Sequence, residues 1–150
     1  MFTQIFNPRH AEAIGQRIQN LQPQSQRQWG TMSPAQMCWH CRQQLEFVLN
    51  PEPAKIYATP FKYEPMRWLA LYLIPWGKGL KTAPEMNVDK QMPPLEGLEA
   101  EREKLLQALQ AVLQKPKVRA IHPLFGNIGR RYWGRLIWKH LDHHLRQFSC

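Results

Sequence analysis

The 150-residue sequence has the length of one domain, taken as residues 1–150, and its 43% of hydrophobic residues is enough to build a core. The formal net charge of +9 is spread along the chain without a run of five like charges, which argues against a nucleic-acid-binding protein. Three cysteines are too few, and odd in number, for a disulfide framework. The longest apolar run is too short to span a membrane, and no secretory leader is expected from the N-terminal residues. These features predict a cytoplasmic protein.

Two helix starts are marked in the first third of the chain. Asn7 is a capping residue followed by proline, which predicts a helix over 8–21. The stretch 33–36, Ser-Pro-Ala-Gln, is a capping box with proline in the first turn, and it predicts a second helix over 34–49.

The second half of the chain begins with an irregular, proline-rich stretch over 51–94. Within it, residues 66–74 are apolar nearly all round and are predicted to form a short helix that caps the bundle, lines a pocket or makes a dimer contact. A third long helix is predicted over 95–114, and a last one from Gly129 or Arg130 onward.

No segment shows the alternation of a strand, and the stretch 120–129 is predicted to be a loop. These elements predict an all-α fold, a four-helix bundle with a long irregular connection and a short extra helix between helices two and three.

The last helix contains three of the six histidines. At about 100° per residue, His140 and His144 lie within its apolar stripe and His143 lies on the flank. Residues four apart are stacked neighbours, so the inward pair could bind one metal ion or could be ordinary buried histidines. The opposite, polar side is formed by Arg131, Arg135, Lys139, Asp142 and Arg146.

A third imidazole is available on the second helix, where His40 lies at the edge of the inward face. Three imidazoles from two helices can hold a divalent ion and leave positions open for water or substrate, which is typical of catalytic sites. Gln44 and Gln147 are candidates to orient a ligand or a bound water. No catalytic residue can be assigned from the sequence.

The remaining cysteines and histidines are expected to be structural. Cys38 and Cys41 lack both the strand context of a redox motif and a second ligand pair for zinc, so they are expected to be small buried residues. His10 and His122 are expected to be structural or exposed to solvent.

Two stretches, "WGTMSPAQMCWHC" at 29–41 and "HPLFGNIGRRYWGRLIWKHLDHHLRQF" at 122–148, resemble the DinB-like (YfiT-like) metalloenzyme superfamily. The closer resemblance is to its branch of small domains with an H-P-x-F-G loop before the last helix. The resemblance implies a four-helix bundle with a divalent metal held by His40, His140 and His144, and with His143 not ligating. Characterised relatives include thiol-dependent transferases, metal-dependent hydrolases and isomerases.

Residues and resemblance together predict a metal-dependent enzyme of the thiol-transferase or hydrolase type that acts on a small molecule. Zn²⁺ is expected first, with Ni²⁺, Mn²⁺ or Fe²⁺ as alternatives, because imidazole ligands alone do not select the ion. A low-molecular-weight thiol is the expected cosubstrate, and a homodimer is expected because related bundles often dimerise. The alternative is a non-catalytic bundle that uses 66–76 for dimerisation or partner binding and retains a structural or vestigial metal site.

Overall fold

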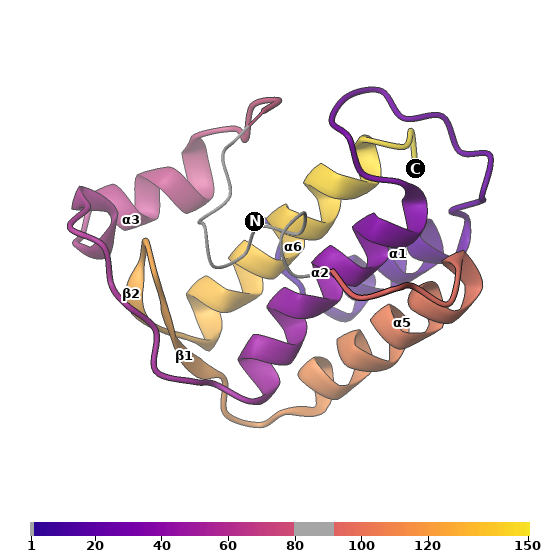
Figure 1. Cartoon of the computed structure of the whole chain (residues 1–150). Helices are drawn as coiled ribbons and strands as arrows, with labels where there is room; N and C mark the ends of the chain where they lie inside the picture. Colours follow the sequence, from indigo (N-terminus) through magenta and orange to yellow (C-terminus); the bar gives the residue numbers. More distant parts are fainter. Residues whose placement is uncertain (1, 80–91) are drawn as a thin grey trace.

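The computed structural model describes residues 2–79 and 92–150, and this part of the chain is mostly helical with a small two-stranded sheet (Figure 1). The prediction of an all-α fold is therefore wrong in one respect, the sheet. In chain order the elements are α1 (Pro8–Gln19), α2 (Pro34–Leu49), the 3-10 helix η1 (Pro60–Lys62), α3 (Met66–Trp68), the π-helix η2 (Leu69–Leu73), α5 (Leu98–Gln114), β1 (Arg119–His122), β2 (Gly126–Gly129) and α6 (Arg130–Arg146).

The helix starts are explained by local hydrogen bonds. The Asn7 side chain accepts from two backbone amides at the start of α1. In the capping box of α2, the Ser33 hydroxyl accepts from the Gln36 backbone amide at 3.2 Å, and the Gln36 side chain accepts from the Ser33 amide at 2.8 Å. α5 begins three residues later than predicted because Gly97 has φ 113°, which a helix cannot contain. α1 ends at Gln19, two residues before the predicted end.

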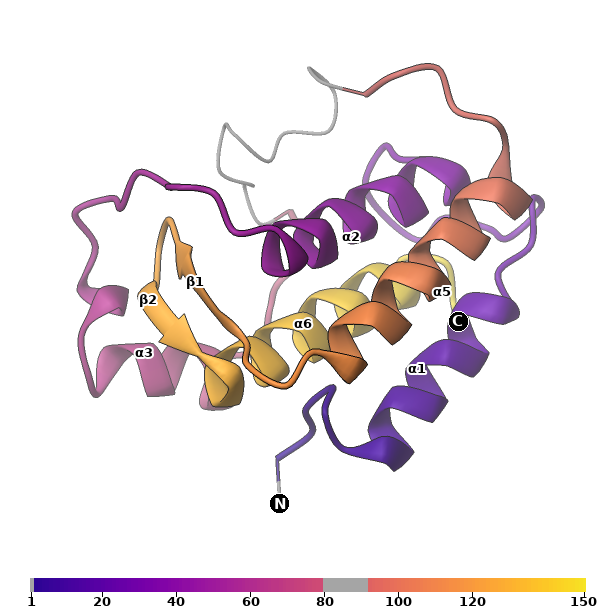
Figure 2. The same cartoon turned by 90° about the horizontal axis from the view of Figure 1, so that it is seen from below.

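The four long helices contact one another in a ring, with α1 against α5 and α6, and α2 against α5 and α6 (Figure 2). This packing is consistent with the predicted bundle. α2 and α6 run antiparallel, because Phe47 meets Trp133 and His40 meets His140. Trp133, fully buried in α6, is among the largest side chains of the core between them.

The stretch predicted as a loop over 120–129 is in fact most of a β-hairpin. β1 and β2 pair antiparallel, with Ala120 opposite Ile128. Gly126 has φ 71° and permits the tight turn, while the His122 ring accepts hydrogen bonds through Nδ1 from the backbone amides of Leu124 and Phe125 at 3.1 and 3.4 Å. The ring of His122 thus has the structural role expected of it. Strands of four residues are too short for an alternating pattern to stand out in the sequence.

The segment 66–74 is helical, as predicted, and it covers a side of α6 that was expected to be polar. Lys139 donates to the carbonyl oxygens of Ala70 and Leu71 at 2.9 and 3.3 Å, and Arg135 Nε donates to that of Leu71 at 2.9 Å. Both cations are buried, and burial lowers the pKa of Lys139 to about 8. Arg135 and Lys139 therefore do not face solvent, because they satisfy carbonyl groups of η2 and its end.

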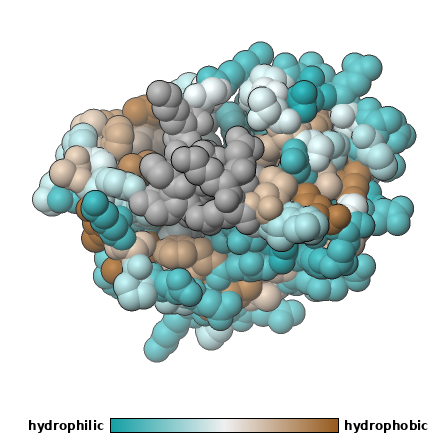
Figure 3. All heavy atoms as spheres, in the orientation of Figure 1, coloured by the Kyte–Doolittle hydropathy of each residue, from teal (hydrophilic) through white to brown (hydrophobic). Residues whose placement is uncertain are grey.

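At the end of η2, two apolar side chains remain open to solvent, Leu73 at 54% and Ile74 at 48% exposure. In Figure 3, hydrophobic side chains gather over the part of the surface where Figure 1 draws α3. Of the helices in the described ranges, none is long and apolar enough to cross a bilayer.

Candidate metal centre

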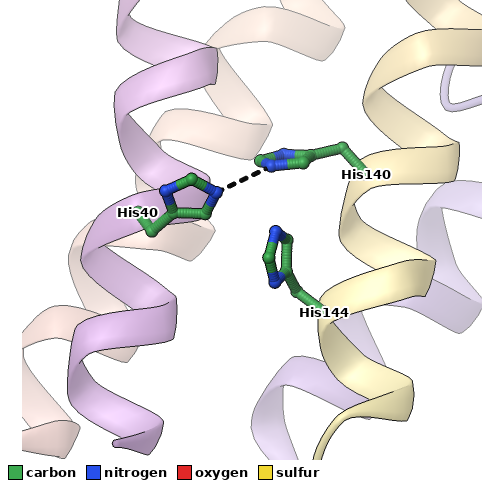
Figure 4. Close-up of side chains that lie close together, drawn as sticks. All are labelled: His40, His140 and His144. Atoms are coloured by element: carbon green, nitrogen blue, oxygen red, sulfur yellow. Dashed lines mark hydrogen bonds between the residues drawn. The ribbon is translucent and has the colours of Figure 1, made fainter. Parts of the chain in front are cut away.

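Three histidines from two helices meet in the interior of the bundle (Figure 4). His40 lies on α2, and His140 and His144 lie on α6. The Nε2 atoms of His40 and His140 are 3.0 Å apart, and the His144 ring centroid is 4.6 Å from each of the other two centroids. One nitrogen from each ring lies within 4.8 Å of the other two, so the cluster could hold a metal ion.

The positions follow from helix geometry. His140 and His144 are one turn apart on the same face of α6, and antiparallel α2 places His40 opposite both. His40 and His144 are buried, at 6% and 8% exposure. His140 is partly exposed as a residue, but its Nδ1 is shielded from solvent and has no hydrogen-bond partner in the described ranges.

Burial keeps all three imidazoles neutral. It lowers the pKa of His40 to about 4 and that of His144 to about 3, and it lowers the pKa of His140 well below its usual range. Mutual repulsion between the ring charges adds to the same effect at His140 and His144. A neutral imidazole retains the lone pair that a metal ion requires.

One of the two glutamines contacts the cluster. Gln147 Oε1 lies 2.7 Å from His144 Nδ1 and accepts a hydrogen bond from Nδ1–H, which leaves Nε2 of His144 as the ring atom with a free lone pair. Gln44 is also buried, but its Oε1 has no hydrogen-bond partner within 2–79 and 92–150. The structure thus connects Gln147, and not Gln44, to the histidines by a hydrogen bond.

The connection between α1 and α2 is anchored at the same place. The Gln28 backbone amide donates to the Gln147 carbonyl oxygen at 2.7 Å. Gly30 has φ 83°, and a Cβ there would lie 2.9 Å from Gln147 Nε2. Only glycine combines this backbone conformation with so close an approach to the side chain that holds His144.

His143 is not one of the three clustered residues, but it is not at the surface either. The residue is 6% exposed, and its ring contacts Trp29, Trp76 and His144, with centroid distances of 5.8, 6.0 and 5.1 Å. Trp76 also contacts His140 at 6.2 Å. The positions of Trp29 and Trp76 could not be predicted from the sequence, because both lie in connections outside the helices, where no periodicity indicates a direction.

Cys38 and Cys41 are buried, as predicted, at 0% and 1% exposure. Burial raises the pKa of the Cys38 thiol to about 12 and raises that of Cys41 well above its usual range. Both therefore remain protonated, and the Cys41 thiol donates weakly to the sulfur of Met37 at 3.6 Å. Protonated, buried thiols are neither nucleophiles nor metal ligands.

Comparison with known proteins gives one match over most of the chain. A family model described as "Protein of unknown function (DUF1569)" matches residues 7–150, which include all three clustered histidines. Neither a curated protein nor a solved structure matches the chain.

Proposed function

Since the chain belongs to the DUF1569 family, whose function is unknown, we propose from its own residues that it is a divalent-metal-dependent enzyme. One observation carries the proposal: the 3.0 Å approach of His40 Nε2 to His140 Nε2, with the His144 ring beside both. The resemblance to the DinB-like superfamily supports the same three ligands, and membership of that superfamily is part of the proposal.

The donor set fits a zinc ion first. Neutral imidazole suits Zn²⁺, and three protein ligands leave a coordination position for water or substrate, as in catalytic zinc sites. A bound ion would supply Lewis acidity, which lowers the pKa of a coordinated water or thiol. Ni²⁺, Mn²⁺ and Fe²⁺ remain alternatives for the same ligands.

The protein's own contribution is to prepare the ligands. The carboxamide of Gln147 selects the tautomer of His144, and burial keeps the imidazoles of His40 and His140 uncharged at neutral pH.

We propose thiol transfer or hydrolysis as the reaction. In the transferase case the thiol comes from a separate small molecule, because Cys38 and Cys41 are buried and held protonated. A cytoplasmic, homodimeric protein remains part of this proposal.

One observation favours the alternative of a non-catalytic module. Leu73 and Ile74 are exposed side by side at the end of η2, where a second copy of the chain could cover them. In that case an ion at the histidine cluster would stabilise the fold and take no part in catalysis.

The first experiment is elemental analysis of untagged protein, wild type beside His40→Ala, His144→Ala and the control His10→Ala. His10 lies at the start of α1, where Nδ1 accepts from the Gln4 backbone amide at 3.2 Å. We expect about one ion per chain in the wild type and the control, and a loss in both other variants with helical content retained. Absence of an ion after reconstitution with Zn²⁺, Ni²⁺ and Mn²⁺ would overturn the proposal.

With the ion established, a screen of thiols with electrophiles and of ester substrates separates the enzyme from the module. The enzyme predicts turnover that is lost in His40→Ala while the fold is kept. A folded, metal-loaded wild type that turns over none of these substrates and forms a dimer sensitive to Leu73→Glu would favour the module.

A further inference from the structure

Two segments outside the long helices each place an indole ring on His143. Trp29 comes from the connection between α1 and α2, and Trp76 follows η2. His143 adjoins His144 at 5.1 Å between centroids, so the two indoles flank the metal centre on its His143 side. The Gln28–Gln147 backbone hydrogen bond holds the Trp29 segment against the end of α6.

Two ring nitrogens in this group have no hydrogen-bond partner within 2–79 and 92–150. They are Nε1 of Trp29 and Nδ1 of His143, and both are shielded from solvent. Buried polar atoms are nearly always paired, because an unpaired one loses its hydrogen bonds to water without replacement. Two such atoms on rings in contact, next to three potential metal ligands, indicate a place for a bound group.

The charges around these rings are mainly positive. Lys78 lies over the Trp29 ring at 5.0 Å from its centroid, and Lys139 over the Trp76 ring at 5.5 Å. The acid nearest in sequence, Asp142, is paired with Arg17 at 2.8 Å and with Arg146 at 3.1 Å. Its charge is therefore balanced, and the surroundings favour an anion.

We propose that Trp29 and His143 form an oxyanion subsite that binds a carboxylate of the molecule acting at the metal centre. The indole N–H can only donate, and His143 donates when Nδ1 carries its proton, so the pair matches carboxylate oxygens. The inference rests on the proposed metal centre and adds the substrate class: small molecules with a carboxylate beside the reacting group. Shielding from water strengthens both hydrogen bonds.

The test uses the full chain loaded with Co²⁺, whose visible spectrum reports on its ligands. Two probes of equal length are titrated, 3-mercaptopropionate and 3-mercapto-1-propanol; the thiol serves as an anchor on the ion, and only the carboxylate differs. We expect the carboxylate probe to bind about tenfold more tightly, as charge-assisted hydrogen bonds to a carboxylate predict.

Trp29→Phe and His143→Phe retain a ring in each place and remove the nitrogens. Each should reduce the preference for the carboxylate probe to about twofold or less, and leave Co²⁺ stoichiometry and binding of the neutral probe unchanged. Trp68→Phe is the matched control, because Trp68 stacks on Tyr72, away from the histidines. This variant should retain the tenfold preference for the carboxylate probe.

The outcomes distinguish failure of the metal centre from failure of the carboxylate subsite. If Co²⁺ is not bound, or is bound equally by His40→Ala, the metal centre fails and the subsite with it. If Co²⁺ is bound through His40 but the wild type does not prefer the carboxylate probe, the subsite alone is overturned. A preference that survives in both Trp29→Phe and His143→Phe also overturns it.

Discussion

Nδ1 of His144 lies 2.7 Å from Oε1 of Gln147, the residue that caps the C-terminal end of α6. A carboxamide oxygen can only accept a hydrogen bond, so this contact places the imidazole proton on Nδ1 and the lone pair on Nε2. A single side chain at the C-cap of this helix thereby determines which nitrogen of His144 faces His40 and His140.

Replacing Gln147 should weaken metal binding without removing a ligand. For Gln147→Ala we expect a loss of about 10- to 100-fold in Zn²⁺ affinity, the usual effect of deleting the partner of a ligating histidine. Gln147→Glu retains an acceptor and should keep most of the affinity. Competition against a chromophoric chelator measures both.

The matched control for that series is Gln107→Ala, on the exposed side of α5, where Gln107 donates to the Glu103 carboxylate. Its affinity should equal that of the wild type. An affinity of Gln147→Ala equal to the control would show that the tautomer of His144 does not depend on Gln147.

The metal-free protein should lose stability as the pH falls from about 6.5 to about 4. Burial lowers the pKa of His40 and His122 to about 4 and that of His144 to about 3, whereas in the unfolded chain a histidine titrates near 6.5. Between these values the unfolded chain binds more protons than the folded protein, so the free energy of unfolding decreases as the pH is lowered. Each histidine contributes a slope of up to about 1.4 kcal/mol per pH unit.

Urea unfolding at a series of pH values measures this slope. In His122→Gln, which removes a titrating ring outside the three-histidine cluster, the proton uptake on unfolding should be about one proton smaller at pH 5. A stability that stays constant from pH 7 to pH 4.5 would mean that these histidines are not held neutral.

Replacing two helical glycines, Gly134 and Gly15, with alanine should change the stability of the fold in opposite directions. A Cβ at Gly134 in α6 would lie 2.8 Å from the Phe6 ring and from the Gln4 side chain, whereas at Gly15 in α1 it would meet nothing within 4 Å. Arg130 packs at 3.6 Å over the Phe6 ring, which limits how far that ring can move.

Gly134→Ala should therefore destabilise the fold by about 1–3 kcal/mol through overpacking. Gly15→Ala should stabilise it by about 0.5–1 kcal/mol, the usual gain in a helix interior. Thermal unfolding of both variants checks the pair, and a stabilised Gly134→Ala would contradict the close packing of the N-terminal segment on α6.

Only one of the three thiols should react in the native protein. Cys150 is partly exposed, while Cys38 and Cys41 are buried with raised pKa values. Titration with an aromatic disulfide reagent at pH 8 should release about one equivalent at once and the other two only in denaturant. Rapid reaction of Cys38 or Cys41 would contradict their role as core residues.

The helices could be predicted because their signals are local. Asn7 and the Ser33–Gln36 capping box act within one turn of chain, and the stacking of His140 on His144 requires only the pitch of a helix. The placing of His40 opposite them was also accessible, since inward faces of packed helices must meet.

What could not be predicted depends on contacts between distant segments. Lys139 lies on the polar side of α6 by any helical projection, and it is buried because η2 presents carbonyl groups to it. The apolar character of 66–74 was the available signal that this segment covers something. For Trp29 no such signal exists, because a loop residue has no face until the loop is anchored.

His40 and His140 are separated by 100 residues of chain, yet their Nε2 atoms lie 3.0 Å apart. An unfolded chain has no preformed grouping of these rings, so an ion held between them would bind the folded protein almost exclusively. Such an ion would act as a reversible cross-link across a very long loop. Each tenfold rise in its free concentration above the dissociation constant would add about 1.4 kcal/mol to the free energy of unfolding. The melting temperature would then follow the supply of metal, and the amount of folded protein in a cell would follow it too.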